Sequence, residues 1–195
     1  MCGRIDQNDL PRLLAGYAWA DPLFNRSHAE GSYNVAPGTW RPVLHAHTGA
    51  DANVDSDADA GTLYVDDMFW GYQASWAEAS GKIPVAINTR LEKITNRYWS
   101  GFLKRGRAIV PANGWYEWTG EKGAKQPWHI HRGDGAPIYM AALAKFGPEQ
   151  APHSAANNES DHASTRNANP AHGFTIVTAN AQGGWSMCTI AARLC

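Results

Sequence analysis

The chain has 195 residues, of which 44% are hydrophobic and 18% charged, with a formal net charge of −1. This length fits one domain with a sizeable core, and no apolar run approaches the roughly 18 residues of a membrane-spanning helix. A secretory signal is not predicted, and three cysteines exclude a disulfide framework. We therefore expect one cytoplasmic domain. The near-zero charge, taken alone, argues against a nucleic-acid partner.

The predicted elements begin with a helix over Asp9–Trp19, where the apolar residues recur at helical spacing behind a polar cap. A second helix, Glu92–Lys104, carries an apolar face that includes Ile94, Tyr98 and Phe102. Because turns rather than regular crossover helices separate the predicted strands, an α+β fold with a largely antiparallel sheet is expected. These strands are Val43–His47, Leu63–Trp70, Ala108–Val110, Trp128–His131, Ile138–Phe146 and Phe174–Ala179.

Two stretches differ in composition from the rest. Gly49–Gly61 contains four aspartates and no Lys or Arg, and Gly147–Gly173 contains no aromatic or large aliphatic residue. Neither can bury enough apolar surface to become ordered by itself, so both are predicted to be flexible insertions. Outside them the chain holds 16 Lys and Arg against 11 Asp and Glu. The neutral total therefore averages a basic core and acidic insertions.

The chain opens with Met1-Cys2-Gly3-Arg4. Removal of Met1 by an aminopeptidase would leave Cys2 with its α-amine and its thiol on neighbouring carbons. Such a 1,2-aminothiol condenses with an aldehyde to an imine, and the thiol then closes on the imine carbon to form a thiazolidine. Cys2 is therefore a candidate nucleophile. The alternative is a structural cysteine that occupies position 2 by chance.

Glu117 lies in the aromatic segment Gly114-Trp115-Tyr116-Glu117-Trp118. A carboxylate surrounded by aromatic rings is poorly solvated, which suits a general acid or base. The alternative is a partly exposed strand residue between aromatics that face the core.

Asn34 precedes the turn signal Pro37-Gly38 and is a candidate to present its amide to a bound group. The alternative is an asparagine that bonds the backbone of its own turn.

The segment Arg90–Arg107 is strongly basic, with six Lys and Arg and the single acid Glu92. Lys93, Arg97 and Lys104 would share one face of the predicted helix, and Trp70, Tyr72, Trp76, Tyr98 and Trp99 are close in the sequence. Basic side chains beside aromatic rings that can stack on nucleobases are typical of proteins that bind single-stranded nucleic acid. The alternative is a solvated helix face.

Two histidine pairs, His45 with His47 and His129 with His131, lack the further ligands that a metal site requires. The chain also has no phosphate-binding or dinucleotide-binding glycine motif. Neither a metal nor a cofactor is expected.

Six segments follow one another in the chain: Met1–Arg4, Tyr33–Gly38, Phe69–Tyr72, Asn88–Glu92, Gly106–Ala112 and Gly114–Trp118. Their content and order resemble the SRAP (SOS response-associated peptidase) domain family, which senses abasic sites in single-stranded DNA. The resemblance extends over roughly Met1–Gly184 apart from the two insertions. It implies a single α+β domain with a curved, barrel-like, mainly antiparallel sheet and a few helices.

The resemblance also implies roles for individual residues. Cys2 would form a thiazolidine crosslink with the ring-opened abasic sugar, Asn34 would orient the reacting group and Glu117 would be catalytic. The residues expected to contact DNA are Arg4, Trp70, Arg90 and Arg97. The implied protein is a monomer that acts in the DNA damage response, with crosslinking and lyase-like activity. Two alternatives stay open: an autoproteolytic cysteine peptidase that uses Cys2, and a passive single-strand binding module.

The sequence departs from the family after Thr178-Ala179, where the family continues to a His-Asp-Arg-x-Pro segment with a catalytic histidine. One set of codons for Trp185–Cys195 reads, in another frame, Val-Asp-Val-His-Asp-Arg-Arg-Pro. We therefore interpret residues 185–195 as a frameshift product in which the C-terminal part of the domain is altered and crosslinking impaired. The alternative is a natural terminus that diverges from the family. Resequencing the gene tests this, and an uninterrupted frame without those codons would contradict it.

Overall fold

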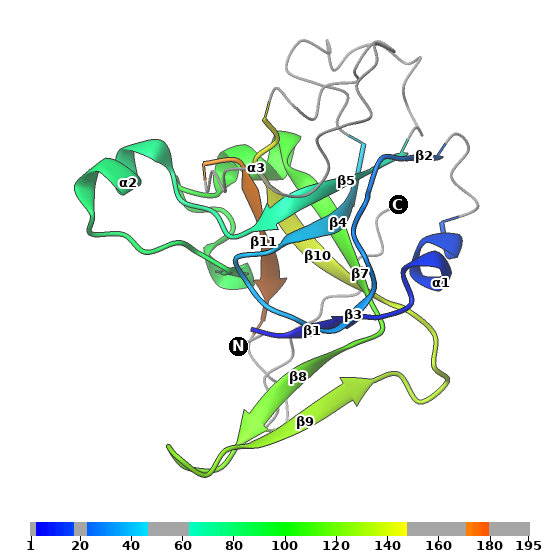
Figure 1. Cartoon of the computed structure of the whole chain (residues 1–195). Helices are drawn as coiled ribbons and strands as arrows, with labels where there is room; N and C mark the ends of the chain where they lie inside the picture. The colour runs from blue at the N-terminus through cyan, green and yellow to red at the C-terminus, as the bar shows by residue number, and fades with distance from the viewer. Residues whose placement is uncertain (1–2, 18–22, 47–62, 148–170, 180–195) are drawn as a thin grey trace.

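The computed structural model describes residues 3–17, 23–46, 63–147 and 171–179. It confirms an α+β fold that is built mainly of antiparallel strands (Figure 1). The helices are α1 (Leu10–Ala15), α2 (Ser75–Ser80), the 3-10 helix η2 (Leu91–Lys93) and α3 (Ser100–Arg105). The strands are β1 (Ile5–Gln7), β2 (Leu23–Asn25), β3 (Ser32–Val35), β4 (Trp40–His45), β5 (Leu63–Trp70), β6 (Asn88–Arg90), β7 (Arg107–Ala112), β8 (Gly114–Thr119), β9 (Gln126–His131), β10 (Ile138–Ala144) and β11 (Gly173–Thr178).

The larger sheet has the strand order β2-β5-β4-β7-β10-β11-β6, and a further pairing of β5 with β11 closes five of its strands into a barrel. The closing pair is parallel, with Gly173 opposite Phe69 and Phe174 opposite Trp70. A Cβ atom added to Gly173 would lie 2.1 Å from the backbone oxygen of Gly71, so only glycine permits this close approach. The predicted barrel-like sheet is therefore confirmed.

Inward- and outward-pointing side chains alternate along the barrel strands, and the inward-pointing ones form the core. In β10, Ile138, Met140 and Ala142 are buried in the main cluster, and in β7 Ala108 and Val110 join them. The residues between them point outward, where α1 and α3 cover part of the barrel. Successive strand side chains point to opposite faces, so the period-two pattern of the sequence becomes an inside and an outside.

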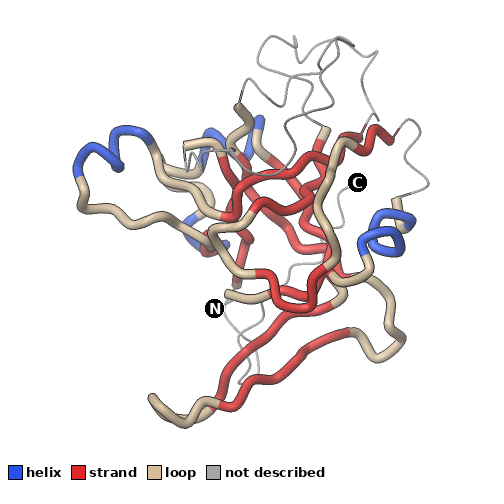
Figure 2. The backbone as a smooth tube through the Cα atoms, in the orientation of Figure 1, coloured by secondary structure: helices blue, strands red, loops and turns tan. Residues whose placement is uncertain are grey.

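The smaller sheet has the order β3-β1-β8-β9. Figure 2 shows its β8–β9 hairpin extending away from the barrel. The hairpin is tied to β1 across β8, because His129 Nε2 lies 3.1 Å from Asp6 Oδ2. This contact fixes the direction of the hairpin relative to the N-terminal strand.

Both predicted helices were too long. The helix predicted over Asp9–Trp19 covers only Leu10–Ala15, with Asp9 as its N-cap and Gly16 at its end. The helix predicted over Glu92–Lys104 is two pieces, η2 and α3. The side chain of Asn96 accepts hydrogen bonds from the backbone N–H groups of Tyr98 and Trp99 at 3.0 and 3.1 Å, and this local turn interrupts the helix.

Several short elements were not predicted: β1, β2, β3, β6, β8 and α2. Most are too short to show a periodic pattern and form because a neighbouring strand pairs with them. The predicted insertions Gly49–Gly61 and Gly147–Gly173 lie almost entirely outside the described residues, although Gly173 itself begins β11. Within the described ranges, no helix has the length and apolar character needed to cross a membrane.

A charged cluster joins the β2 edge to the barrel. The guanidinium of Arg26 donates to both oxygens of Asp66 at 2.7 and 2.5 Å, and His45 Nε2 lies 2.9 Å from Oδ2. Burial of Asp66 opposes its charged form, but the hydrogen bonds from His45 and Arg26 outweigh burial and hold its pKa below the ordinary value.

A carboxylate with a lowered folded-state pKa stabilises the protein above its unfolded pKa of about 3.9, and this contribution is lost as the pH falls through the folded pKa. We expect Asp66→Asn to lower the free energy of unfolding at pH 7 by about 2 kcal/mol. With the same substitution, the free energy of unfolding should decline less steeply as the pH falls below about 4. Urea denaturation between pH 2 and 7 measures both effects. Asp134→Asn, which removes an exposed pair with Arg132, is the control and should change little. An Asp66→Asn protein with the stability and pH dependence of the wild type would contradict the prediction.

Candidate nucleic-acid interface

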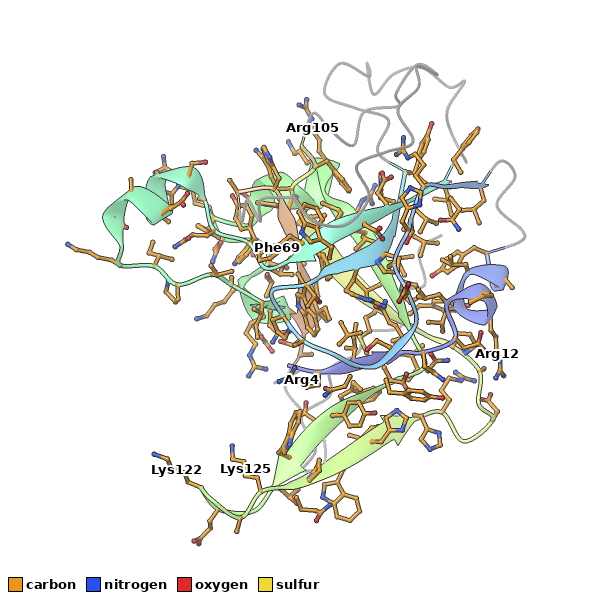
Figure 3. All side chains as sticks on the ribbon, viewed as in Figure 1. Arg4, Arg12, Phe69, Arg105, Lys122 and Lys125 are labelled. Carbon is orange, nitrogen blue, oxygen red and sulfur yellow. The ribbon has the colours of Figure 1, made fainter. Side chains whose placement is uncertain are left out.

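The pairing of β1 with β8 brings the N-terminal segment to Glu117. Ile5 lies opposite Trp115 and Asp6 opposite Gly114, and the backbone N–H of Tyr116 donates to the Arg4 oxygen at 3.0 Å. Glu117 follows Tyr116 directly in β8, so the N-terminal segment before β1 runs beside the strand that carries Glu117. Figure 3 shows Arg4 below the barrel, above the β8–β9 hairpin. Cys2 lies outside the described residues and precedes Gly3 directly in the chain.

Glu117 is half-buried, and only one aromatic residue of its own segment shares its face. Trp115, two residues away, points to the same side and packs against the core cluster, whereas Tyr116 and Trp118 point to the other side. The expectation that all three aromatics enclose the carboxylate was therefore wrong. The strand period places a second ring there instead: Trp128 lies directly opposite Glu117 on β9.

Arg90 ends β6, which pairs in parallel with β11. Its Nη1 donates to the backbone oxygen of Ala179 at 3.4 Å, and the side chain is half-buried. The intervening Thr89 is buried and hydrogen-bonded to the Thr175 hydroxyl at 2.7 Å. Asn88 and Arg90 therefore share the opposite face of β6.

The end of β6 and β11 lies near β1 and β8. Figure 1 shows β11 running toward the N-terminal end of β1. Residues from both regions, including Ile5, Trp115, Ile87 and Ile176, also belong to one hydrophobic cluster. The structure thus brings Arg4, Arg90 and Glu117 to one end of the barrel.

Trp70 does not lie at this surface. Its side chain is 0% exposed, stacks on Phe174 with 6.2 Å between ring centroids, and donates its indole N–H to the Ile87 oxygen at 3.0 Å. Direct contact of Trp70 with DNA bases does not fit this placement. The alternating pattern of β5 places Trp70 inside the closed barrel, where it supports the site by packing.

An exposed aromatic residue, Trp76, lies instead in a pocket of about 480 Å³ beside α2, which is lined by Tyr72, Ala74, Trp76, Arg97 and Tyr98. Trp76 is 62% exposed, and its ring meets the edge of Tyr98 with 6.0 Å between centroids. Tyr98 in turn accepts a hydrogen bond from the Ala74 backbone at 3.3 Å. The exposed Arg97 adds a positive charge to this aromatic pocket.

Because the helix is interrupted, Lys93, Arg97 and Lys104 do not form the single helical face that the sequence predicted.

Asn34 is exposed near the end of β3. Strand β1 lies between β3 and β8, so two strand spacings, together about 10 Å, separate Asn34 from the strand of Glu117. The described residues also contain no cluster of three His, Cys, Asp or Glu that would hold a metal ion.

Comparison with known proteins shows which family the chain belongs to. The sequence pattern of the SOS response associated peptidase (SRAP) family matches residues 1–193. The chain is 35% identical over 189 residues to the abasic site processing protein YedK of Escherichia coli, covering 94% of this chain and 70% of that protein. It is 30% identical over 145 residues to the abasic site processing protein HMCES of Gallus gallus, covering 67% of this chain and 42% of that protein.

Solved structures agree with this assignment. A phage-related protein of Bordetella bronchiseptica superposes with a TM-score of 0.61 at 30% identity, over 91% of this chain and 69% of that one. A protein of Bacteroides thetaiotaomicron shares the fold alone, with a TM-score of 0.58 at 18% identity over 92% of this chain and 68% of that one. The ordered sequence motifs, the barrel and these matches lead to one conclusion: the chain belongs to the SRAP family.

Proposed function

We propose that this protein captures abasic sites in single-stranded DNA by a covalent bond to Cys2, after Met1 has been removed. The observation that carries the proposal is the pairing of β1 with β8: the Tyr116 N–H donates to the Arg4 oxygen, Glu117 follows Tyr116, and Cys2 lies two residues before Arg4 in the chain. The names of the relatives YedK and HMCES, both abasic site processing proteins, support the same substrate. The cytoplasm, which is reducing, would keep the Cys2 thiol free.

The chemistry balances as two steps. The Cys2 α-amine adds to the aldehyde of the ring-opened abasic sugar, and one water leaves to give an imine. The thiol sulfur then adds to the imine carbon while its proton passes to the nitrogen, which closes the thiazolidine. Glu117 would give and take the protons of the first step, since the departing hydroxyl must be protonated and the attacking amine must lose a proton.

Cations at the same end of the barrel would hold the DNA strand. Arg4 and Arg90 lie beside the proposed reaction centre, and Arg97 lies in the pocket with Trp76. Guanidinium groups bind phosphate, and exposed indole rings stack on bases without sequence preference. We therefore transfer the base-contact role expected of Trp70 to Trp76. Asn34, exposed near the end of β3, would contact the DNA strand.

A denaturing gel tests the proposal. We expect the protein to form a slow-migrating adduct with a single-stranded oligonucleotide that carries one abasic site, and none with the intact oligonucleotide. A passive binding module would shift the oligonucleotide only on a native gel, with strong salt dependence. A cysteine peptidase would cleave a peptide bond and show no response to DNA. Absence of the adduct with protein shown by mass spectrometry to lack Met1 would refute the covalent mechanism.

A further inference from the structure

The face of the β8–β9 hairpin that carries Glu117 also carries an exposed tryptophan. Trp128 lies directly opposite Glu117 in the register, so both side chains point to the same side of the sheet. The exposed fraction of Trp128 is 49%, whereas Trp115, on the same face nearer the barrel, packs against the core. Along this face the side chains therefore change from buried to exposed within a few residues, and Glu117 lies at the boundary.

A hydrogen bond orients the Trp128 ring. Its indole N–H donates to the Thr119 hydroxyl at 2.9 Å, and Thr119 lies on the same face as Glu117. With its one polar group already bonded, the indole has only its apolar π-face left for a partner. A rigid aromatic ring of this kind loses little conformational freedom when another flat ring stacks on it.

The surroundings of Trp128 favour a nucleic-acid strand as that partner. The hairpin tip carries the exposed Lys122 and Lys125, which Figure 3 shows at the end of the hairpin farthest from the barrel. In the proposed function the abasic sugar lies at Glu117; Trp128 lies directly opposite Glu117 on β9, and the two lysines lie farther along the same hairpin. The hairpin is thus continuous with the proposed site, and its tip carries two lysines against the single acid Glu121, an excess of positive charge that favours phosphate.

We propose that Trp128 is a base-stacking platform for the nucleotide adjacent to the abasic site, and that Lys122 and Lys125 bind the phosphates that follow. The proposal rests on the proposed function for the location of the abasic sugar. It extends the DNA footprint from the end of the barrel along the hairpin.

Fluorescence anisotropy with a labelled single strand containing a tetrahydrofuran abasic analogue tests this, because that analogue has no aldehyde and reports binding alone. We expect Trp128→Ala to weaken binding about 10-fold and Trp128→Phe to keep it within about threefold, since base–aromatic stacking tolerates the change of ring. The matched control is Trp118→Ala, which removes a 39% exposed tryptophan from the opposite face of the same hairpin and should leave binding unchanged. Lys122→Glu with Lys125→Glu should lower the salt dependence of binding.

The outcomes separate the two proposals. Equal binding by Trp128→Ala and wild type would overturn the stacking platform, and so would equal loss in Trp128→Ala and Trp128→Phe, which would identify the Thr119 hydrogen bond instead. Equal loss in Trp118→Ala would point to hairpin folding and also overturn it. The proposed function is judged independently, by whether the wild type forms the covalent adduct with a true abasic site. A wild type that binds the analogue through Trp128 but forms no adduct would refute only the covalent mechanism.

Discussion

Cys2→Ala is expected to eliminate the adduct that survives denaturation, while the protein continues to bind single-stranded DNA. The variant keeps an N-terminal α-amine and can still form an imine with the abasic aldehyde. Without a thiol the imine cannot close to a thiazolidine, and it hydrolyses back to aldehyde and amine. The measurement is adduct yield on a denaturing gel, with and without borohydride, for proteins whose loss of Met1 is confirmed by mass spectrometry.

Borohydride makes the prediction sharper because it reduces an imine to a stable amine. Cys2→Ala should give an adduct only with borohydride, whereas the wild type should give one without it. Cys188→Ala and Cys195→Ala remove the other two thiols of the chain and should behave as the wild type. A wild-type protein extended by a few residues at its N-terminus should give neither product, since its Cys2 nitrogen is an amide. Equal borohydride-free yields from wild type and Cys2→Ala would show that another group reacts.

Glu117→Gln should slow adduct formation about 100-fold without weakening binding to the tetrahydrofuran strand. The amide has nearly the shape of the carboxylate and preserves the β8–β9 pairing, in which Glu117 lies opposite Trp128. It cannot, however, exchange a proton during imine formation. Single-turnover rates with excess protein report the chemical step, and anisotropy reports binding.

The matched control is Glu121→Gln, which removes an exposed carboxylate from the turn of the same hairpin. That variant should react at the wild-type rate. If Glu117→Gln also reacts at the wild-type rate, Glu117 is not the proton shuttle. If binding and rate fall together by the same factor, Glu117 acts in binding the strand rather than in the reaction.

Several predictions from the sequence depended on local pattern, and the structure agrees with them. The ranges Ile138–Phe146 and Phe174–Ala179 were predicted as strands, and β10 and β11 occupy most of them. The apolar residues grouped on the predicted helix Glu92–Lys104 do pack together around Trp99, although the helix is interrupted. Local pattern cannot show that interruption, because it depends on the Asn96 side chain competing for backbone N–H groups.

Other features depended on pairings between distant residues. Trp70 looks the same in sequence whether its ring faces DNA or the core, and the closing β5–β11 pair decides that it is buried. Trp128 had no motif to distinguish it, and only the β8–β9 register places it opposite Glu117. Asn34 occupies a recognisable motif, yet β1 lies between its strand and that of Glu117.

By itself, the sequence determined the chemistry available to this protein: an aminothiol at Cys2, a carboxylate at Glu117, a set of arginines and a family whose motifs occur in order. Tertiary structure alone decided which of these groups meet. Arg4 is separated from Tyr116 by more than one hundred residues, and strand pairing brings their backbones within hydrogen-bond distance. The physical reason is that side-chain chemistry is local to a residue, whereas strand register is set by how the whole barrel buries its apolar faces.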